Sequence, residues 1–100
     1  MSTIEKEIIS ELSDLVFSMM DNAEPFDMAV VECLTEDFMS ENGLKFKDYT
    51  DFLIEVDGNE EAKYWMNFES TSDYLFDCIN SKLITKSRVH TIVGMCVTTI

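Results

Sequence analysis

Histidine, proline and glycine are scarce in this sequence, and their scarcity excludes several classes of protein. His90 is the only histidine, so the sequence has no histidine pair for a metal site. Any catalytic triad that needs a histidine would have to use His90. One proline and three isolated glycines provide neither a flexible linker nor a glycine-rich phosphate loop. We therefore expect a single domain over residues 1–100 that is not an enzyme and that uses no cofactor and no metal.

Long apolar runs and closely spaced cysteines are also missing. Charged residues at positions 5–7 interrupt any signal-peptide core, and the apolar stretch 89–100 is too short to span a membrane. Cys33, Cys78 and Cys96 are widely spaced and form no CxxC motif, so we interpret them as buried, reduced thiols. These features predict a soluble, cytoplasmic protein.

Basic residues are few and unevenly placed. Seven Lys and Arg face twenty Asp and Glu, which gives a formal net charge of −13. All the carboxylates lie at or before Asp77, whereas residues 78–100 contain Lys82, Lys86 and Arg88 and no acid. Nucleic acid repels such a chain, so direct binding to a phosphate backbone is disfavoured. The charge asymmetry indicates an interaction surface rather than uniform solubilising charge.

The N-terminal forty residues have the apolar spacing of two amphipathic helices, from about Thr3 to Met20 and from Pro25 to a stop at Asn42-Gly43. The short connection between them predicts antiparallel neighbours. We assign the core-facing stripe of the second helix to Phe26, Val30, Cys33, Leu34 and Phe38. Asp37 falls inside this apolar arc, so it should pair with Lys45, Lys47 or Arg88, because burying an unpaired carboxylate is costly.

The periodicity changes after Gly43. Residues 50–56 and 62–68 alternate between apolar and polar positions around Asp57-Gly58, which predicts a β-hairpin. A third helix should begin near Ser70 and end near Lys86, and residues 88–100 favour a covered strand, with a helix from His90 to Cys96 as the alternative. The predicted order is α-α-β-β-α-β, an α+β fold with the helices on one face of a small antiparallel sheet.

The candidate functional residues are the carboxylates opposite the two apolar stripes. They are Glu7, Glu11, Asp14, Asp21, Glu32 and Glu36. Such an array can match a groove rich in Lys and Arg or imitate the charge of phosphates, although an ordinary solvated surface has the same composition. Trp65 shares a face of the predicted hairpin with Leu53. It is either covered by the core or exposed as the anchor of a partner interface.

In size, acidity and lack of catalytic residues, the chain is similar to the small inhibitors found among phage anti-defence proteins and bacterial nuclease-immunity proteins. This is a likeness of physical type, and no motif carries it. It implies a binding protein that occupies the basic nucleic-acid site of an enzyme or defence complex. The alternative is a structural or adaptor module that oligomerises, for example as a homodimer. Its C-terminal strand or its Leu53/Trp65 face would form the contact, and its charge would only confer solubility.

Overall fold

The computed structural model describes residues 3–55, 57–65 and 67–100. Helices dominate the described chain, with a 3-10 helix before α2 and another before α4. In chain order the elements are α1 (Thr3–Asp21), η1 (Pro25–Asp27), α2 (Met28–Glu41), β1 (Leu44–Phe46), α3 (Tyr49–Glu55), η2 (Glu60–Trp65), α4 (Phe68–Asn80), α5 (Lys86–Cys96) and β2 (Val97–Thr99). The broad α+β class is therefore right, but the order of elements differs from the predicted one.

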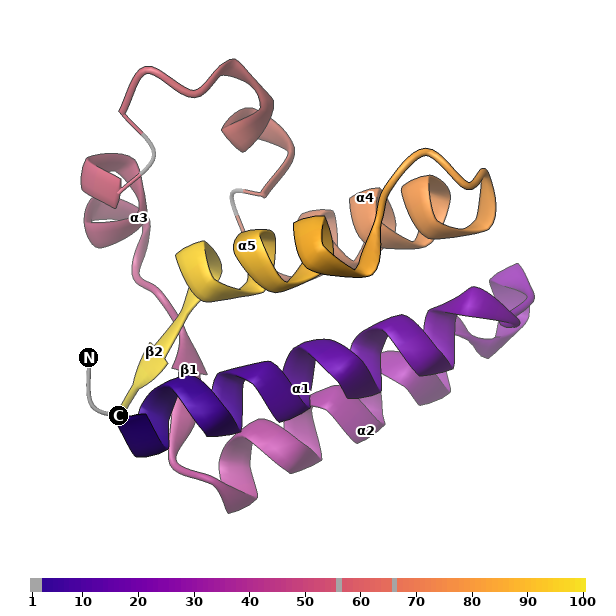
Figure 1. Cartoon of the computed structure of the whole chain (residues 1–100), viewed down its shortest axis with the longest axis horizontal. Helices are drawn as coiled ribbons and strands as arrows, with labels where there is room; N and C mark the ends of the chain where they lie inside the picture. Colours follow the sequence, from indigo (N-terminus) through magenta and orange to yellow (C-terminus); the bar gives the residue numbers. More distant parts are fainter. Residues whose placement is uncertain (1–2, 56, 66) are drawn as a thin grey trace.

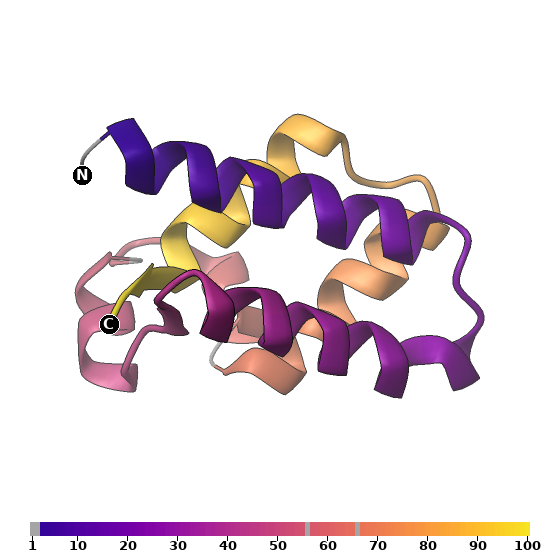
Figure 2. The same ribbon diagram turned by 90° about the horizontal axis from the view of Figure 1, so that it is seen from below.

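The helices form two layers. Helices α1 and α2 lie side by side and run in opposite directions, and α4 and α5 cross the same side of this pair (Figure 1, Figure 2). Helix α1 contacts α2, α4 and α5, so it lies at the centre of the assembly. Its buried stripe of Leu12, Val16 and Met20 shares one core with Ile79 of α4 and Ile92 of α5. No element of the described residues packs on the other side of the α1–α2 layer (Figure 1).

A two-stranded antiparallel sheet ties the end of the chain to its middle. Leu44 pairs with Thr99 and Phe46 pairs with Val97. The pairing is extended by backbone hydrogen bonds from Ile100 N to Gly43 O (2.9 Å) and from Lys47 N to Cys96 O (2.7 Å). Gly43 ends the α2 segment with φ +66°, a left-handed conformation that glycine adopts without a Cβ penalty. The predicted stop at Asn42-Gly43 is confirmed.

The predicted hairpin at residues 50–68 is wrong, because most of this segment is helical. Residues 49–55 form α3, which buries Phe52, and η2 follows the turn at Gly58. The reason lies at Asn59, whose Oδ1 accepts a hydrogen bond from Glu61 N (3.0 Å) and whose carbonyl accepts one from Ala62 N (3.2 Å). These bonds start a helical turn instead of returning the chain as a strand. Val56 and Met66, which the hairpin assignment included, lie outside the described residues.

The prediction of a strand at residues 88–100 is also wrong. The alternative, a helix from His90 to Cys96, is closer to the structure. Lys86–Cys96 is helical, and Thr85 caps it by accepting a hydrogen bond from Arg88 N on its side-chain oxygen (3.1 Å). Val89, Ile92, Val93 and Cys96 are buried, and this spacing of three and four residues gives the helix one covered face. Only the last residues, Val97–Thr99, are extended.

The third predicted helix is present with different ends. Asn67 rather than Ser70 caps α4, since Asn67 Oδ1 accepts a hydrogen bond from Ser70 N (2.9 Å). The helix ends at Asn80, because Lys82 adopts a left-handed φ of +59° and Leu83 N donates back to Cys78 O (2.9 Å). Among the described residues, no helix has the length and apolar character needed to cross a membrane.

Candidate protein-interaction surface

The outer face of α1 presents two carboxylates to solvent. Glu7 and Glu11 are exposed and lie one helical turn apart, opposite the buried stripe of the helix. Within the described part of the chain, neither carboxylate takes part in an ion pair or a hydrogen bond. Both are available to a charged partner.

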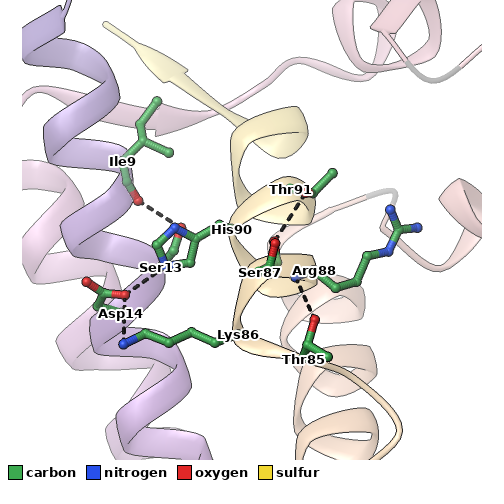
Figure 3. Close-up of polar contacts among 9 residues, drawn as sticks. All are labelled: Ile9, Ser13, Asp14, Thr85, Lys86, Ser87, Arg88, His90 and Thr91. Carbon is green, nitrogen blue, oxygen red and sulfur yellow. Dashed lines mark hydrogen bonds and ion pairs between the residues drawn. The ribbon is translucent and has the colours of Figure 1, made fainter.

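Asp14 has a different role, because it faces α5. Its Oδ1 accepts a hydrogen bond from His90 Nε2 (2.7 Å) and lies 3.3 Å from Lys86 Nζ (Figure 3). The hydrogen bond from His90, with the charge of Lys86, lowers the pKa of the Asp14 carboxyl below its ordinary value of 3.8. Asp14 therefore joins the N-terminal and C-terminal helices, and the predicted set of partner-binding carboxylates is split between two environments.

Lys82 and Arg88 also pair with carboxylates of other elements, and the partner of Lys82 is Asp21. Lys82 Nζ donates to Asp21 Oδ1 (2.9 Å), and the Arg88 guanidinium donates to Glu61 Oε2 (3.0 Å). Together with the Lys86 pair, these contacts place all three Lys and Arg residues of segment 78–100 in internal ion pairs. Each Lys and Arg of the basic C-terminal segment therefore has a counter-ion within the molecule.

Glu32 and Glu36 lie on the flank of α2 that approaches α4. Partial burial raises the pKa of the Glu32 carboxyl above its ordinary value of 4.5, and repulsion from Asp73, Glu69 and Glu36 raises it further. This is a cluster of like charges with no cation beside it in the described residues. The geometry does not make it a metal centre, since no three His, Cys, Asp or Glu side chains among the described residues are arranged to hold an ion.

The largest departure from the sequence prediction is the rotation of α2. The core takes Val31, Thr35 and Met39, and the Thr35 hydroxyl is satisfied by donating to Val31 O (2.7 Å). The stripe assigned to the core is turned outward instead. Asp37 is exposed, without a Lys45, Lys47 or Arg88 partner, and Cys33 is exposed rather than buried.

This rotation leaves an apolar row on the protein surface. Phe26 is 81 % exposed, Val30 is 59 % exposed and Leu34 is 48 % exposed. The three residues are spaced four apart, so they follow one side of the η1–α2 segment over about two turns. We call these three residues the α2 apolar row.

Trp65 cannot anchor a partner in this structure, because its side chain is fully buried at 0 % exposure. The Arg88 guanidinium lies 5.5 Å from the centroid of the indole ring, and the Tyr74 ring centroid lies 6.0 Å from it. The prediction that Trp65 is an exposed anchor is therefore wrong, and the alternative, that the core covers it, is right. Leu53 is about half exposed, but it does not share a surface with the buried Trp65.

No protein-family model, curated protein or solved structure matches this chain. The geometry of the surface therefore carries the whole functional argument. Of the residues predicted to bind a partner, the structure leaves Glu7, Glu11 and Glu36 exposed, half-buries Glu32, and uses Asp14 and Asp21 internally.

Sequence reasoning missed the α2 apolar row as a surface feature, because it assigned those residues to the core. A signal for the ambiguity was present. The segment contains two apolar arcs, one through Val30 and Leu34 and one through Val31 and Met39, and a helix of this length can bury either. The second arc includes Thr35, whose hydroxyl made it look like the less apolar choice.

Proposed function

We propose that this protein is a small acidic binding protein that inhibits a nucleic-acid-processing enzyme or defence complex by occupying its basic, nucleic-acid-binding surface. The partner would be a protein rich in Lys and Arg at its nucleic-acid site. The carboxylates that carry the contact are Glu7 and Glu11 of α1 and Glu36 of α2, with Glu32 at the edge of the set.

One observation supports this proposal above the others. The Lys and Arg residues of segment 78–100 pair with Asp14, Asp21 and Glu61, while Glu7, Glu11 and Glu36 form no ion pair among the described residues. Charge needed only for solubility could be placed anywhere on the surface. Here Lys82 and Lys86 pair with α1 and Arg88 pairs with η2, whereas Glu7, Glu11 and Glu36 stay exposed, and such exposed negative charge would steer a basic surface toward it.

The mechanism is competition. A surface that binds nucleic acid gains affinity by neutralising phosphates, and a carboxylate array offers the same counter-charge without the nucleic acid. Binding should therefore weaken as salt increases, and excess DNA or RNA should displace the protein from its partner.

The test uses immobilised full-length protein, a cell lysate, and elution by increasing salt or by excess duplex DNA. A triple variant, Glu7→Gln, Glu11→Gln and Glu36→Gln, should lose the captured partner at lower salt than the unmodified protein does. A control with exposed acids elsewhere, Asp57→Asn and Glu60→Gln, should change elution much less. The captured protein should then lose nucleic-acid binding or activity when the unmodified protein is added.

Two results would count against the proposal. One is a dominant partner that binds no nucleic acid, and the other is equal elution of the triple variant and the control. The second candidate, an oligomerising module, is tested by light scattering of the unmodified protein. A stable symmetric dimer whose formation is independent of Glu7, Glu11 and Glu36 would favour it.

A further inference from the structure

The α2 apolar row is an unusual surface for a chain with this charge. Phe26, Val30 and Leu34 are apolar side chains spaced four residues apart and left 48–81 % exposed, while a different face of α2 fills the core. Single exposed apolar residues need no explanation, but an aligned set beside other exposed residues of the same face, including Cys33, is typical of a recognition site.

The charges around the row decide what can cover it. Residues 24–41 contain six carboxylates and no Lys, Arg or His. None of these six carboxylates forms an ion pair within the described residues. Glu36 and Asp37 are exposed on the same helix, within one turn of Leu34. The row is therefore an apolar strip bordered by unneutralised negative charge.

A second copy of this chain fits the strip poorly. Packing two α2 helices face to face would bring two sets of six carboxylates together as apolar surface excludes water between them, and like charges across an interface oppose association. A partner with the opposite pattern has no such cost. Apolar residues spaced three and four apart would cover the row, and Lys or Arg on either side would pair with the acidic border.

From this complementarity we infer that the α2 apolar row is the docking site for a cationic amphipathic helix of a partner protein. This inference rests on the proposed function, since it names the kind of element through which the basic partner is held. It also separates two contributions to binding. The carboxylates supply long-range attraction, which salt screens, and the row supplies apolar burial, which salt does not weaken.

The inference is tested with the full-length protein and a synthetic probe. The probe is a fluorescent helical peptide of about 18 residues, made of Leu and Lys with all Leu on one face, which is long enough to cover the two-turn row. Its control is a peptide of the same composition with the Leu residues scattered. Binding is followed by fluorescence anisotropy over a range of salt concentrations. The amphipathic peptide should bind more tightly than the scrambled one, and the difference should persist at high salt.

Two matched double variants locate the contact. Val30→Gln with Leu34→Gln should weaken binding of the amphipathic peptide roughly tenfold or more, because each lost contact removes part of the burial energy of an aliphatic side chain. The control is Ile54→Gln with Leu83→Gln, two apolar residues that are more exposed than Val30 and Leu34 and lie outside the row. It should leave binding unchanged. All four side chains are substantially exposed, so circular dichroism should show both variants folded.

The outcomes distinguish this inference from the proposed function. Equal binding of both peptides, or no effect of the Val30 and Leu34 substitutions, overturns the docking site, while the charge-dependent capture and DNA displacement described above still test the proposed function. Conversely, loss of the captured partner with the Val30 and Leu34 variant but not with the Glu7, Glu11 and Glu36 variant would support the docking site and overturn competition by charge. A dimer that dissociates in the row variant would overturn the cationic occupant.

Discussion

The helical state of residues 86–96 can be tested with one pair of neighbouring substitutions. Ile92 is fully buried at 0 % exposure, whereas Thr91 is exposed and its hydroxyl donates to Ser87 O within the same helix (3.2 Å). In a strand covered on both faces, adjacent residues would point to opposite covered sides and both would be sensitive. In the helix, one is in the core and its neighbour is in water. Ile92→Ala and Thr91→Ala should therefore behave very differently.

The expected magnitudes follow from burial. Removing most of a fully buried Ile side chain costs about 3 kcal/mol of unfolding free energy, which includes lost transfer energy and the residual cavity. For a domain of this length, that corresponds to a decrease in Tm of roughly 12–24 °C. Thr91→Ala removes no core contact, and alanine is the better helix former, so its effect should stay within about 0.5 kcal/mol.

The measurement is urea unfolding of each variant, followed by circular dichroism and by fluorescence. Trp65 is the only tryptophan and is fully buried, so its emission reports the loss of the core. Coincident transitions by the two probes would justify a two-state free energy. A Thr91→Ala variant that loses as much stability as Ile92→Ala, or an Ile92→Ala variant that loses almost none, would refute the helical assignment and the packing derived from it.

Two further predictions concern pH and have opposite signs. The pKa of Asp14 is lowered in the fold, so its carboxylate stabilises the protein at any pH above the ordinary pKa of 3.8, and this contribution is lost as the pH falls through the folded pKa. Asp14→Asn should lower Tm at neutral pH, and the difference from the unmodified protein should vanish in acid; a difference that persists in acid would contradict this. The pKa of Glu32 is raised, so its ionised form destabilises the fold. Glu32→Gln should raise Tm at neutral pH, with the gain disappearing below about pH 4.5, and a loss of Tm at neutral pH would show that the carboxylate is stabilising.

Some of this structure could be predicted from local signals. The first helix has a strong apolar period, and it forms over nearly the expected residues, Thr3–Asp21. Gly43 ends the next helical segment as expected, since its left-handed conformation suits glycine. The hairpin failed because Asp57-Gly58 is compatible with more than one turn, and the side chain of Asn59 directed the chain into a 3-10 helix. A short alternating segment does not hold enough information to exclude that outcome.

The candidate site was less predictable than the fold. The positions of the acids along the chain indicated a negative surface, but not which acids would be exposed. Glu7 and Glu11 remain open to solvent, whereas Asp14 and Asp21 are held by Lys86 and Lys82, from a segment more than sixty positions away. Helical periodicity places an acid on the outer arc of a helix, but a later helix can still cover one side of that arc. Only the packing of α5 and of the loop after α4 against α1 separates the two groups.

Three properties of this protein depend only on composition and on neighbours along the chain, so they can be derived from the sequence. They are its charge, the local preference for helix seen in α1, and the absence of the usual catalytic motifs. The tertiary structure alone decided which face of α2 is buried. Its two apolar arcs have similar periodicity, and the choice depends on what α1 and the sheet strand β1 present to it. That choice buried Thr35 with its hydroxyl satisfied, exposed Asp37 to water, and placed Phe26, Val30 and Leu34 on the surface.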